Sequence, residues 1–527
     1  MATDPQMHDL QIAARKAVSV NPATGETLHE FECTSEQEVL SAVVRAHAAQ
    51  PTWAALGIRK RIAILREFQR LLHQKKSEVA QLVTREAGKP YVEALLTEVL
   101  VVLDAVRFLI DNAFRLLRDE PVSHGNLAMK TKSGRLLREP WGVIGIISPW
   151  NYPFSIPATE SIAALVAGNA VVLKPSELTS LTAIKLVSLL HQAGVPKEIF
   201  QVIPGDRVTG AALIAASIDK LIFTGSVATG KRIAQAAAAR LLPVVLELGG
   251  KDPMLVLDDA DIEIASSGAV WGAFVNAGQA CLSVERCYVH RSLYQPFLEA
   301  CVRKTRQLRV GNGMDPETDV GPMIHQHQLL NVESQVEDAL GLGARVLVGA
   351  NRLPALGPNF YAPTVLADIT HAMRIMREET FGPVLPVMPF DSDEEAIRLA
   401  NDSEYGLAAS VWTGDHNRGE ALARRIQAGT VMVNDAISCF GISEAPHGGV
   451  KSSGIGRSHG RLGLEEMVRT KYLDSDRLPR MEKIWWYGYG KAFSRQMEGL
   501  LDMQFAQGWK RRLQGAVKAA GALRPKP

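Results

Sequence analysis

The feature that most constrains the fold is an alternation of short apolar runs with helix-length segments, which begins near Trp141. The runs are rich in Val and Ile and read VIGII, AVVL, FQVI, KLIFTG and LPVVLEL. The segments between them open at Pro, Ser or Asp, so the pattern predicts βαβ units and a parallel sheet. A second alternating block extends from Met254 to about Asn434 and predicts a second α/β lobe.

The two ends of the chain follow other patterns. From Thr34 to Leu116 apolar residues recur at spacings of three and four, and TSEQEV is typical of a capping box, so a layer of helices is predicted. Residues 477–527 hold eleven Lys or Arg against three Asp or Glu, a local net charge of +8, and three of the eight tryptophans. We interpret this segment as a separate basic, aromatic tail.

The composition excludes several classes of protein. Lys and Arg number 58 and Asp and Glu number 56 in 527 residues, which excludes a disordered polyanion and a histone-like polycation. The first residues contain no apolar stretch for a secretory signal. The most apolar run, Ile162 to Leu173, is too short to span a bilayer and predicts a helix end, a turn at Gly168 and Asn169, and a buried strand.

The cysteines favour a reducing compartment. They are odd in number and have no CxxC spacing, which argues against a disulfide framework or a zinc ribbon; they are Cys33, Cys281, Cys287, Cys301 and Cys439. We therefore expect a cytoplasmic protein.

No metal is expected, because His325 and His327 have no third ligand at a zinc spacing and are interpreted as a solvated helix start. The acidic group Asp258, Asp259 and Asp261 lacks the glycine of an EF-hand loop and is interpreted as a helix N-terminus.

Two residues stand where reactive groups are often held. Cys281 follows the glycine-bearing turn Asn276-Ala-Gly-Gln-Ala, whose backbone amides can be directed at a thiolate. Glu247 follows an apolar strand and precedes a Gly-Gly pair, and a carboxylate there projects into the crevice where α/β sheets bind ligands. Taken alone, each has a plainer interpretation, because lone cysteines are more often small buried apolar residues and such glutamates are more often caps or solvated strand ends.

The segment from Leu221 to Arg232 predicts a strand, a glycine-flanked turn and a helix start. Such a turn can hold phosphate through backbone amides and the helix N-terminus, although Gly225 and Gly230 are also compatible with close packing. The segment nearly matches the nucleotide P-loop GxxxxGK[ST], but Arg232 stands where a magnesium-binding hydroxyl is required. The turn therefore indicates phosphate more than it indicates ATP.

Seven segments in chain order resemble the aldehyde dehydrogenase superfamily, and the likeness extends from about Asn21 to Thr470. They are Pro149-Trp-Asn-Tyr-Pro, Lys174-Pro-Ser-Glu, Phe223-Thr-Gly-Ser, Glu247-Leu-Gly-Gly-Lys, Gly278-Gln-Ala-Cys, Glu379-Thr-Phe-Gly-Pro and the glycine-rich segment from Gly448 to Arg457. The resemblance implies an α/β fold with two doubly wound parallel-sheet domains and a small strand-rich oligomerisation arm that pairs subunits into a dimer or tetramer. The implied boundaries are 17–124 and 141–247 for the cofactor-binding domain, 248–436 for the catalytic domain, 125–140 and 437–475 for the arm, and 476–527 for the tail.

The resemblance also implies a reaction. Cys281 would attack an aldehyde, Asn151 and the Cys281 backbone amide would hold the oxyanion, hydride would leave to a nicotinamide, and Glu247 would activate the water that hydrolyses the thioester to an acid. The residues implied in cofactor binding are Lys174 and Glu177 at the adenosine ribose, Ser226 at the pyrophosphate, Glu379 and Phe381 at the nicotinamide ribose, and Trp150, Gly225 and Leu248 in the same motifs. Glu177 would repel a 2′-phosphate, so NAD is favoured over NADP.

Two departures from the family pattern bear on the substrate. His447 stands where many relatives have Phe, and GRSHGRLGL is closer to a subgroup often named succinic-semialdehyde dehydrogenase. Those enzymes place a carboxylate-binding arginine where this chain has Thr159. The other positions implied in the substrate tunnel are mainly apolar, namely Tyr152, Ile156, Phe274, Val275, Ile437 and Phe440. A neutral, fairly hydrophobic aldehyde is expected, with succinic semialdehyde as the alternative.

Rival functions come from other classes. A P-loop nucleotide hydrolase is argued against by Arg232, and a non-catalytic binding protein by the joint presence of Cys281, Glu247 and Asn151. The tail lies outside the resemblance, and residues 493–513 are predicted to be helical. Its aromatic and basic residues suit either peripheral membrane contact or docking on this protein or a neighbouring subunit, whereas no nucleic-acid partner is expected.

Overall fold

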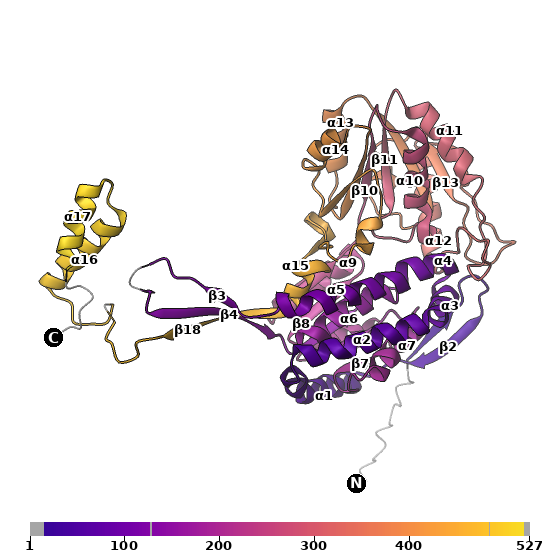
Figure 1. Cartoon of the computed structure of the whole chain (residues 1–527). Helices are drawn as coiled ribbons and strands as arrows, with labels where there is room; N and C mark the ends of the chain where they lie inside the picture. Colours follow the sequence, from indigo (N-terminus) through magenta and orange to yellow (C-terminus); the bar gives the residue numbers. More distant parts are fainter. Residues whose placement is uncertain (1–14, 127–128, 484, 521–527) are drawn as a thin grey trace, which may run out of the picture. The chain divides into compact units, whose positions relative to one another are not determined.

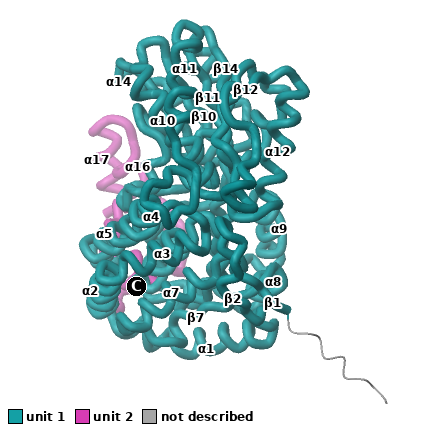
Figure 2. The backbone as a smooth tube through the Cα atoms, turned by 90° about the vertical axis from the view of Figure 1, so that its right-hand side faces the viewer, with its two compact units in different colours: residues 1–117, 140–469 teal, residues 118–139, 470–527 magenta. Residues whose placement is uncertain are grey.

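The computed structural model describes residues 15–126, 129–483 and 485–520. The chain divides into two compact units, one of residues 1–117 and 140–469 and the other of residues 118–139 and 470–527 (Figure 2). Among the described residues, no helix is both long enough and apolar enough to cross a bilayer.

The first α/β sheet has six strands in the order β17-β9-β8-β5-β6-β7. The chain places β5, β6 and β7 outward in one direction and then returns to place β8 and β9 on the other side of β5, which confirms the predicted doubly wound arrangement. All neighbours are parallel except β17, which is antiparallel to β9. The strands are β5 (Val143–Ile147), β6 (Ala170–Lys174), β7 (Phe200–Val202), β8 (Lys220–Thr224), β9 (Val244–Glu247) and β17 (Gly454–Ile455).

Helices cover both faces of this sheet, and the predicted N-terminal helical layer supplies several of them (Figure 1). Helix α1 packs against α8 and β6, whereas α2 and α5 pack on each other and on α6. Ser35 forms the predicted capping box with Glu38 at the start of α1. The helices are α1 (Glu36–Ala55), α2 (Ile58–Gln74), α3 (Lys76–Ala87), α5 (Val101–Leu116), α6 (Ser155–Ala167), α7 (Ser180–Gln192), α8 (Arg207–Ala215) and α9 (Val227–Ala238).

The apolar run Ile162–Leu173 has the predicted structure. Helix α6 ends at Ala167, Gly168 adopts a left-handed φ of 101°, and the buried strand β6 begins at Ala170. The connection between α6 and β6 is therefore as short as a glycine C-cap allows.

The second α/β sheet has seven strands in the order β12-β13-β14-β11-β10-β15-β16, and only β12 is antiparallel to its neighbour. It is the predicted second lobe. Its strands are β10 (Asp252–Val256), β11 (Val284–His290), β12 (Arg345–Val348), β13 (Thr364–Ala367), β14 (Val384–Phe390), β15 (Ala408–Trp412) and β16 (Thr430–Val433). Its helices are α10 (Ile262–Phe274), α11 (Tyr294–Thr305), α12 (Gln326–Gly341), α13 (Asp393–Asn401) and α14 (His416–Ala423).

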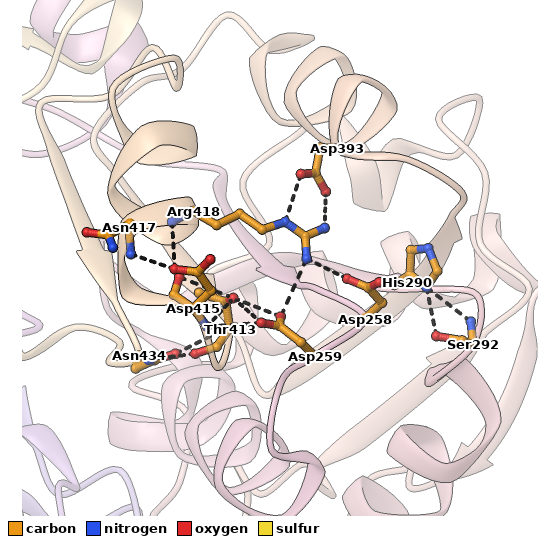
Figure 3. A network of polar contacts seen from close by, with 10 residues as sticks. All are labelled: Asp258, Asp259, His290, Ser292, Asp393, Thr413, Asp415, Asn417, Arg418 and Asn434. Atoms are coloured by element: carbon orange, nitrogen blue, oxygen red, sulfur yellow. Dashed lines mark hydrogen bonds and ion pairs between the residues drawn. The ribbon is translucent and has the colours of Figure 1, made fainter.

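Ion pairs centred on Arg418 tie together the carboxyl ends of β10 and β15 and the starts of α13 and α14 (Figure 3). The Arg418 guanidinium lies 2.6 Å from Asp258 and 2.5 Å from Asp393. The expectation that the acidic group forms a helix N-terminus holds for Asp261 alone, which caps α10 by accepting from the Ile264 N–H at 3.0 Å. Asp258 and Asp259 instead face Arg418, because the chain leaves β10 before α10 begins.

The second unit contains a three-stranded sheet and the tail. The sheet has the order β18-β4-β3, with β3 at Glu120–Val122, β4 at Lys132–Pro140 and β18 at Val468–Asp476. The tail forms two helices, α16 (Lys491–Phe505) and α17 (Trp509–Lys518), rather than the single helix expected over residues 493–513. The break occurs at Gly508, whose φ of 89° is incompatible with a continuous helix.

Candidate active site

The candidate site lies where the two sheets of the first unit bring their loops together. Asn151 and Gly225 follow β5 and β8, and Glu247 is the last residue of β9, so these residues lie at carboxyl ends of the first sheet. Cys281 and Phe381 precede β11 and β14, at amino ends of the second sheet. The β5–β8 junction is where the strand order reverses, which is the place where doubly wound sheets bind ligands.

A cavity of about 280 Å³ joins the predicted residues. All of them line it except Lys174 and Glu177. The lining residues are Pro149, Trp150, Asn151, Ile156, Thr224, Gly225, Ser226, Glu247, Leu248, Gly249, Cys281, Gln328, Asn331, Glu379 and Phe381.

The backbone before Cys281 is held in an unusual turn. Asn276 and Ala277 have φ of 53° and 55°, in the left-handed region that residues with a Cβ seldom adopt. Gly278 is required because a Cβ there would lie 2.1 Å from the Gly382 carbonyl oxygen. The Asn276 N–H donates to the partly buried Glu93 carboxylate at 2.9 Å. Packing and hydrogen bonding thus hold this strained turn, and strain of this kind is concentrated at functional sites.

The Cys281 thiol is partly buried and lies near three acidic side chains. Burial raises its pKa well above the usual range, and the carboxylates of Asp252, Glu379 and Glu247 raise it further. The thiol is therefore protonated at neutral pH in this state. A cation in the cavity would favour the thiolate.

Glu247 is 5% exposed, and neither of its carboxylate oxygens has a hydrogen-bond partner of normal geometry among the described residues. Burial raises its pKa well above the usual range, and the neighbouring Glu160 raises it further, against opposing effects of Arg457 and Ser458. His447 lies 4.0 Å away, and burial lowers the pKa of its imidazole to about 3, so it is neutral. Glu247 thus has the properties of a base rather than of an ion-pair partner.

Asn151 is fixed beside the Cys281 turn. The Asn151 Nδ2 donates to the Gln279 backbone carbonyl at 3.1 Å, and the Asn151 backbone carbonyl accepts from Asn276 Nδ2 at 3.1 Å. The side chain amide has a second N–H, which leaves it able to donate to an oxygen in the cavity.

The turn after β8 has the features of an anion site. Ser226 caps α9 by accepting from the Thr229 N–H at 3.3 Å, and Gly225 donates its N–H to the Glu247 carbonyl at 3.0 Å. Gly230 and Lys231 lie inside α9, not in a phosphate-binding loop ahead of it, so the P-loop alternative is not supported. Lys174 is the last residue of β6 and Glu177 follows it, with 3.4 Å between Nζ and Oε2, and the Glu177 side chain is 46% exposed.

Glu379 and Phe381 complete the cavity on the side of the second lobe. Glu379 accepts from the Gly250 N–H at 3.1 Å, and burial raises its pKa to about 8. Phe381 has a φ of 53°, donates its N–H to Glu285 at 2.9 Å, and meets Trp150 edge to face with 5.4 Å between ring centroids. A buried ion pair between Glu285 and Lys251 supports this backbone.

A second, apolar pocket of about 190 Å³ meets the first cavity at Cys281 and Ile156. Among the residues that the structure describes, no charged side chain lines it. Its walls are Leu96, Thr97, Val101, Tyr152, Ile156, Trp271, Ala280, Cys281, Leu282, Ile437, Ser438, Phe440 and Gly441. Of the residues expected in a substrate tunnel, Phe274 and Val275 pack in the core of the second lobe instead. Thr159 also lies elsewhere, with its hydroxyl donating to the Ser155 carbonyl at 2.9 Å.

Several residues around the site were not found from the sequence. Leu96 and Thr97 come from a π-helical turn, Leu95–Leu100, which has no clear sequence signal. The same turn holds Glu98, which forms a fully buried ion pair with Lys89 at 2.7 Å. Lys89 in turn lies 3.6 Å from the centroid of the Tyr152 ring.

Comparison with known proteins identifies the fold and the class of reaction. Residues 11–473 match the aldehyde dehydrogenase family. The chain belongs to this family. A solved structure of the aldehyde dehydrogenase from Bacillus cereus in complex with NAD+ matches with a TM-score of 0.84 and 35% identity, over 88% of this chain and 93% of that one. As an aldehyde dehydrogenase, the protein is an NAD(P)-dependent oxidoreductase that converts aldehydes to carboxylic acids.

Its relatives within the family differ in substrate. The 4,4'-diapolycopene aldehyde oxidase of a Methylomonas species is 39% identical over 93% of this chain and 91% of its own length. A putative succinate-semialdehyde dehydrogenase [NADP(+)] of Mycolicibacterium smegmatis is 38% identical over 87% of this chain and 88% of its own length. A betaine aldehyde dehydrogenase of Rhizobium meliloti is 39% identical over 86% of this chain and 92% of its own length.

Proposed function

We propose that Cys281 is the nucleophile of this aldehyde dehydrogenase. The Cys281 thiol would lose its proton to solvent once the positively charged cofactor binds, and the thiolate sulfur would add to the aldehyde carbon. The carbonyl oxygen would become an oxyanion that Asn151 Nδ2 and the Cys281 backbone N–H stabilise. The bound nicotinamide dinucleotide supplies the two-electron oxidant. Glu247 would then take a proton from a water molecule whose oxygen attacks the thioester carbon, and breaking the C–S bond releases the acid and leaves Cys281 as the thiolate that attacks the next aldehyde. The convergence of these three side chains on one cavity carries the proposal.

Single-turnover kinetics test these roles. Glu247→Gln should keep a stoichiometric burst of reduced cofactor and lose steady-state turnover by about 10²–10⁴-fold, because only hydrolysis needs the base. Cys281→Ala should lose both phases. Wild-type turnover in the Glu247 variant would assign the base to another group.

The cavity residues fit a dinucleotide. The N-terminus of α9 with Ser226 and Gly225 would hold the pyrophosphate, and Trp150 and Leu248 would line its path. The carboxylates of Glu177 and Glu379 would accept from ribose hydroxyls, with Lys174 beside Glu177. We propose NAD as the preferred cofactor, because the exposed carboxylate of Glu177 opposes a 2′-phosphate. The first lobe, at 17–124 and 141–247, would then bind the cofactor, and the second, at 248–436, would supply the nucleophile.

We propose that the substrate is a neutral, fairly hydrophobic aldehyde. The observation behind this is the apolar pocket that opens onto Cys281 without a charged wall residue. Succinic semialdehyde is the alternative, favoured by the names of several relatives. A panel with hexanal and succinic semialdehyde at matched concentrations separates them, and a higher kcat/KM for succinic semialdehyde would contradict the apolar assignment.

We also propose a homodimer or homotetramer in the cytoplasm, assembled through the arm at 125–140 and 437–475. In the small sheet, β18 and β3 are the outer strands, and outer strands offer unpaired backbone groups to a second copy. Light scattering of the purified chain measures the state directly, and a monomer at micromolar concentration would contradict the proposal.

The tail hairpin has a face that suits a membrane surface. Gly499 and Gly515 let α16 and α17 approach so closely that a Cβ at either would lie 2.4–2.5 Å from the other helix. Trp509, Leu513 and Val517 recur along α17 and are 59–72% exposed. Basic residues flank them on the same helix, namely Lys510, Arg511, Arg512 and Lys518. We propose that this face binds anionic lipid peripherally, with the rings and aliphatic groups among the headgroups.

Vesicle sedimentation tests the tail. The full chain should pellet with phosphatidylserine-containing vesicles at low salt, and Leu513→Ser with Val517→Ser should reduce pelleting. Leu241→Ser is the matched control, because Leu241 is 89% exposed on the other unit. Equal pelleting of all three proteins, or of a chain ending at Asp476, would remove the membrane role. A change of oligomer size in the tail variant would instead indicate docking on a neighbouring subunit.

A further inference from the structure

A second buried carboxyl group, Glu160, lies beside Glu247 and has no part in the mechanism above. Glu160 is on α6 and is 4% exposed. Its Oε1 accepts from the Thr224 hydroxyl at 3.2 Å, and its Oε2 has no hydrogen-bond partner among the described residues. Leaving a buried carboxyl oxygen unpaired is costly, so a retained one calls for an explanation.

Glu160 lines a small internal cavity and accepts a hydrogen bond from a residue of the active-site cavity. Thr224 lines the active-site cavity and is paired with Glu247 in the β8–β9 ladder. Glu160 itself lines the internal cavity, whose volume of about 30 Å³ is enough for a water molecule. The polar residues around that cavity are Thr159, Ser443, Ser458 and His459.

His459 also lines the internal cavity and is only partly buried. It has a φ of 58°, an unfavourable conformation for a residue with a Cβ. Its Nδ1 is buried without a hydrogen-bond partner among the described residues. The imidazole thus presents an unpaired nitrogen in a strained backbone position near the cavity, a combination that packing alone does not explain.

The pKa values of Glu160 and His459 favour the neutral form of each side chain, so the two groups can transfer a proton without remaining charged. Burial raises the pKa of Glu160 to about 8, and burial lowers the pKa of His459 to about 4, so both groups are mainly neutral at pH 7. Around Glu247 lie three further ionisable groups, Arg457, the neutral His447 and the Cys281 thiol. At the start of α6, Glu98 is paired with Lys89. A protonated carboxyl can accept a proton on one oxygen and release another from its second oxygen, which keeps the site neutral.

We propose that Glu160 is a positioning residue for hydrolysis, which accepts the proton that Glu247 takes from water and releases one through the internal cavity toward His459. The inference rests on the proposed role of Glu247 as the base. In each turnover the O–H bond of the attacking water breaks, Glu247 gains that proton, and the proton leaves by way of the Glu160 carboxyl to cavity water and then to His459 and solvent. Without an exit, Glu247 would remain protonated and could not activate the next water.

Glu160→Gln in the full-length enzyme is the test, with Thr159→Ser as the matched control on the same helix and cavity. The burst rate and KM for aldehyde should stay within about twofold of wild type, whereas steady-state kcat should fall by about tenfold or more. The pH profile of kcat should change, and formate or another small weak acid should restore part of the rate. Thr159→Ser should leave all of these at wild-type values.

The outcomes are distinct. An unchanged kcat and pH profile in Glu160→Gln would overturn the proposal, and so would an equal fall of burst rate and kcat, which a structural role would produce. If Glu160→Gln does not fold, His459→Asn gives the same test, because Asn tolerates the left-handed conformation and should also slow kcat without slowing the burst. If Glu247→Gln keeps full turnover, the proposed base itself is wrong, whichever result Glu160→Gln gives.

Discussion

The buried ion pair between Lys89 and Glu98 should be essential for stability, and removing only its negative charge tests this. Both side chains are fully buried, and the Lys89 nitrogen is 2.7 Å from Glu98 Oε1. Glu98 Oε2 also accepts from the N–H groups of Phe154 and Ser155 at 3.1 and 2.7 Å, where α6 begins. Glu98→Gln keeps an acceptor for those N–H groups but leaves the Lys89 ammonium buried without its counter-charge.

The expected loss in free energy of unfolding is about 3–5 kcal/mol, as for other buried pairs broken on one side. At a urea dependence of about 3 kcal/mol per molar, the unfolding midpoint followed by tryptophan fluorescence should fall by about 1 M or more. Lys89 also lies over the Tyr152 ring, so the apolar pocket should be disturbed as well, with a raised KM for aldehyde.

A surface pair supplies the control. Lys16 and Glu30 lie 3.0 Å apart with side chains 59% and 54% exposed, and Glu30→Gln should cost at most about 1 kcal/mol. The double variant Lys89→Met with Glu98→Gln should recover part of the lost stability, because no uncompensated charge remains. A midpoint for Glu98→Gln equal to that of Glu30→Gln would refute the reasoning.

Three further predictions follow from the site. For straight-chain aldehydes up to the length of the apolar pocket, kcat/KM should rise about fourfold per added CH₂, since each is worth about 0.8 kcal/mol; a flat series would argue against apolar recognition. Glu177→Gln should raise kcat/KM for NADP relative to that for NAD, measured with one aldehyde under identical conditions, and an unchanged ratio would exclude Glu177 as the discriminating residue. Burial raises the pKa of Glu160 and of Glu379 to about 8 from 4.5, so their contribution to stability is full below pH 4.5, declines as the unfolded chain ionises, and is lost by about pH 8. Urea midpoints between pH 5 and 9 should show this decline, and Glu160→Gln should make it shallower.

The sequence predicted the architecture well because the strands of both lobes are buried on two faces. Runs such as VIGII and AVVL are continuous rather than alternating, and that pattern indicates a parallel sheet. The end of α6 was predictable because glycine is the residue type that most readily adopts a left-handed conformation, and Gly168 closes the helix in that conformation. The tail was harder, because Gly508 breaks it into two helices that stabilise each other through contacts between residues distant in sequence.

The residues lining the cavity were predictable only where a motif carried them. Cys281, Glu247 and Asn151 each lie within three residues of a glycine or proline, residue types that mark turns at the ends of strands. Glu160 and Glu98 stand inside helical segments, and Lys89 stands in the loop after α3; in either setting a charged residue is ordinarily a solvated one. Their burial depends on which helices pack together, and that information is not local. The same reason explains why Phe274 and Val275 were assigned to the tunnel although they face the core.

The Arg418 ion pairs have a consequence for how the second lobe tolerates change. They occupy the carboxyl edge of its sheet, the edge at which such a sheet would ordinarily bind a ligand, while Cys281 lies at the opposite, amino edge. In this lobe the ion pairs that stabilise the fold therefore lie at one end of the strands, and the proposed nucleophile lies at the other end. Substitutions around Arg418, whether natural or engineered, should lower the thermal stability of the protein without lowering its activity. Substitutions in the loops at the amino edge, which hold the nucleophile, should lower the activity as well.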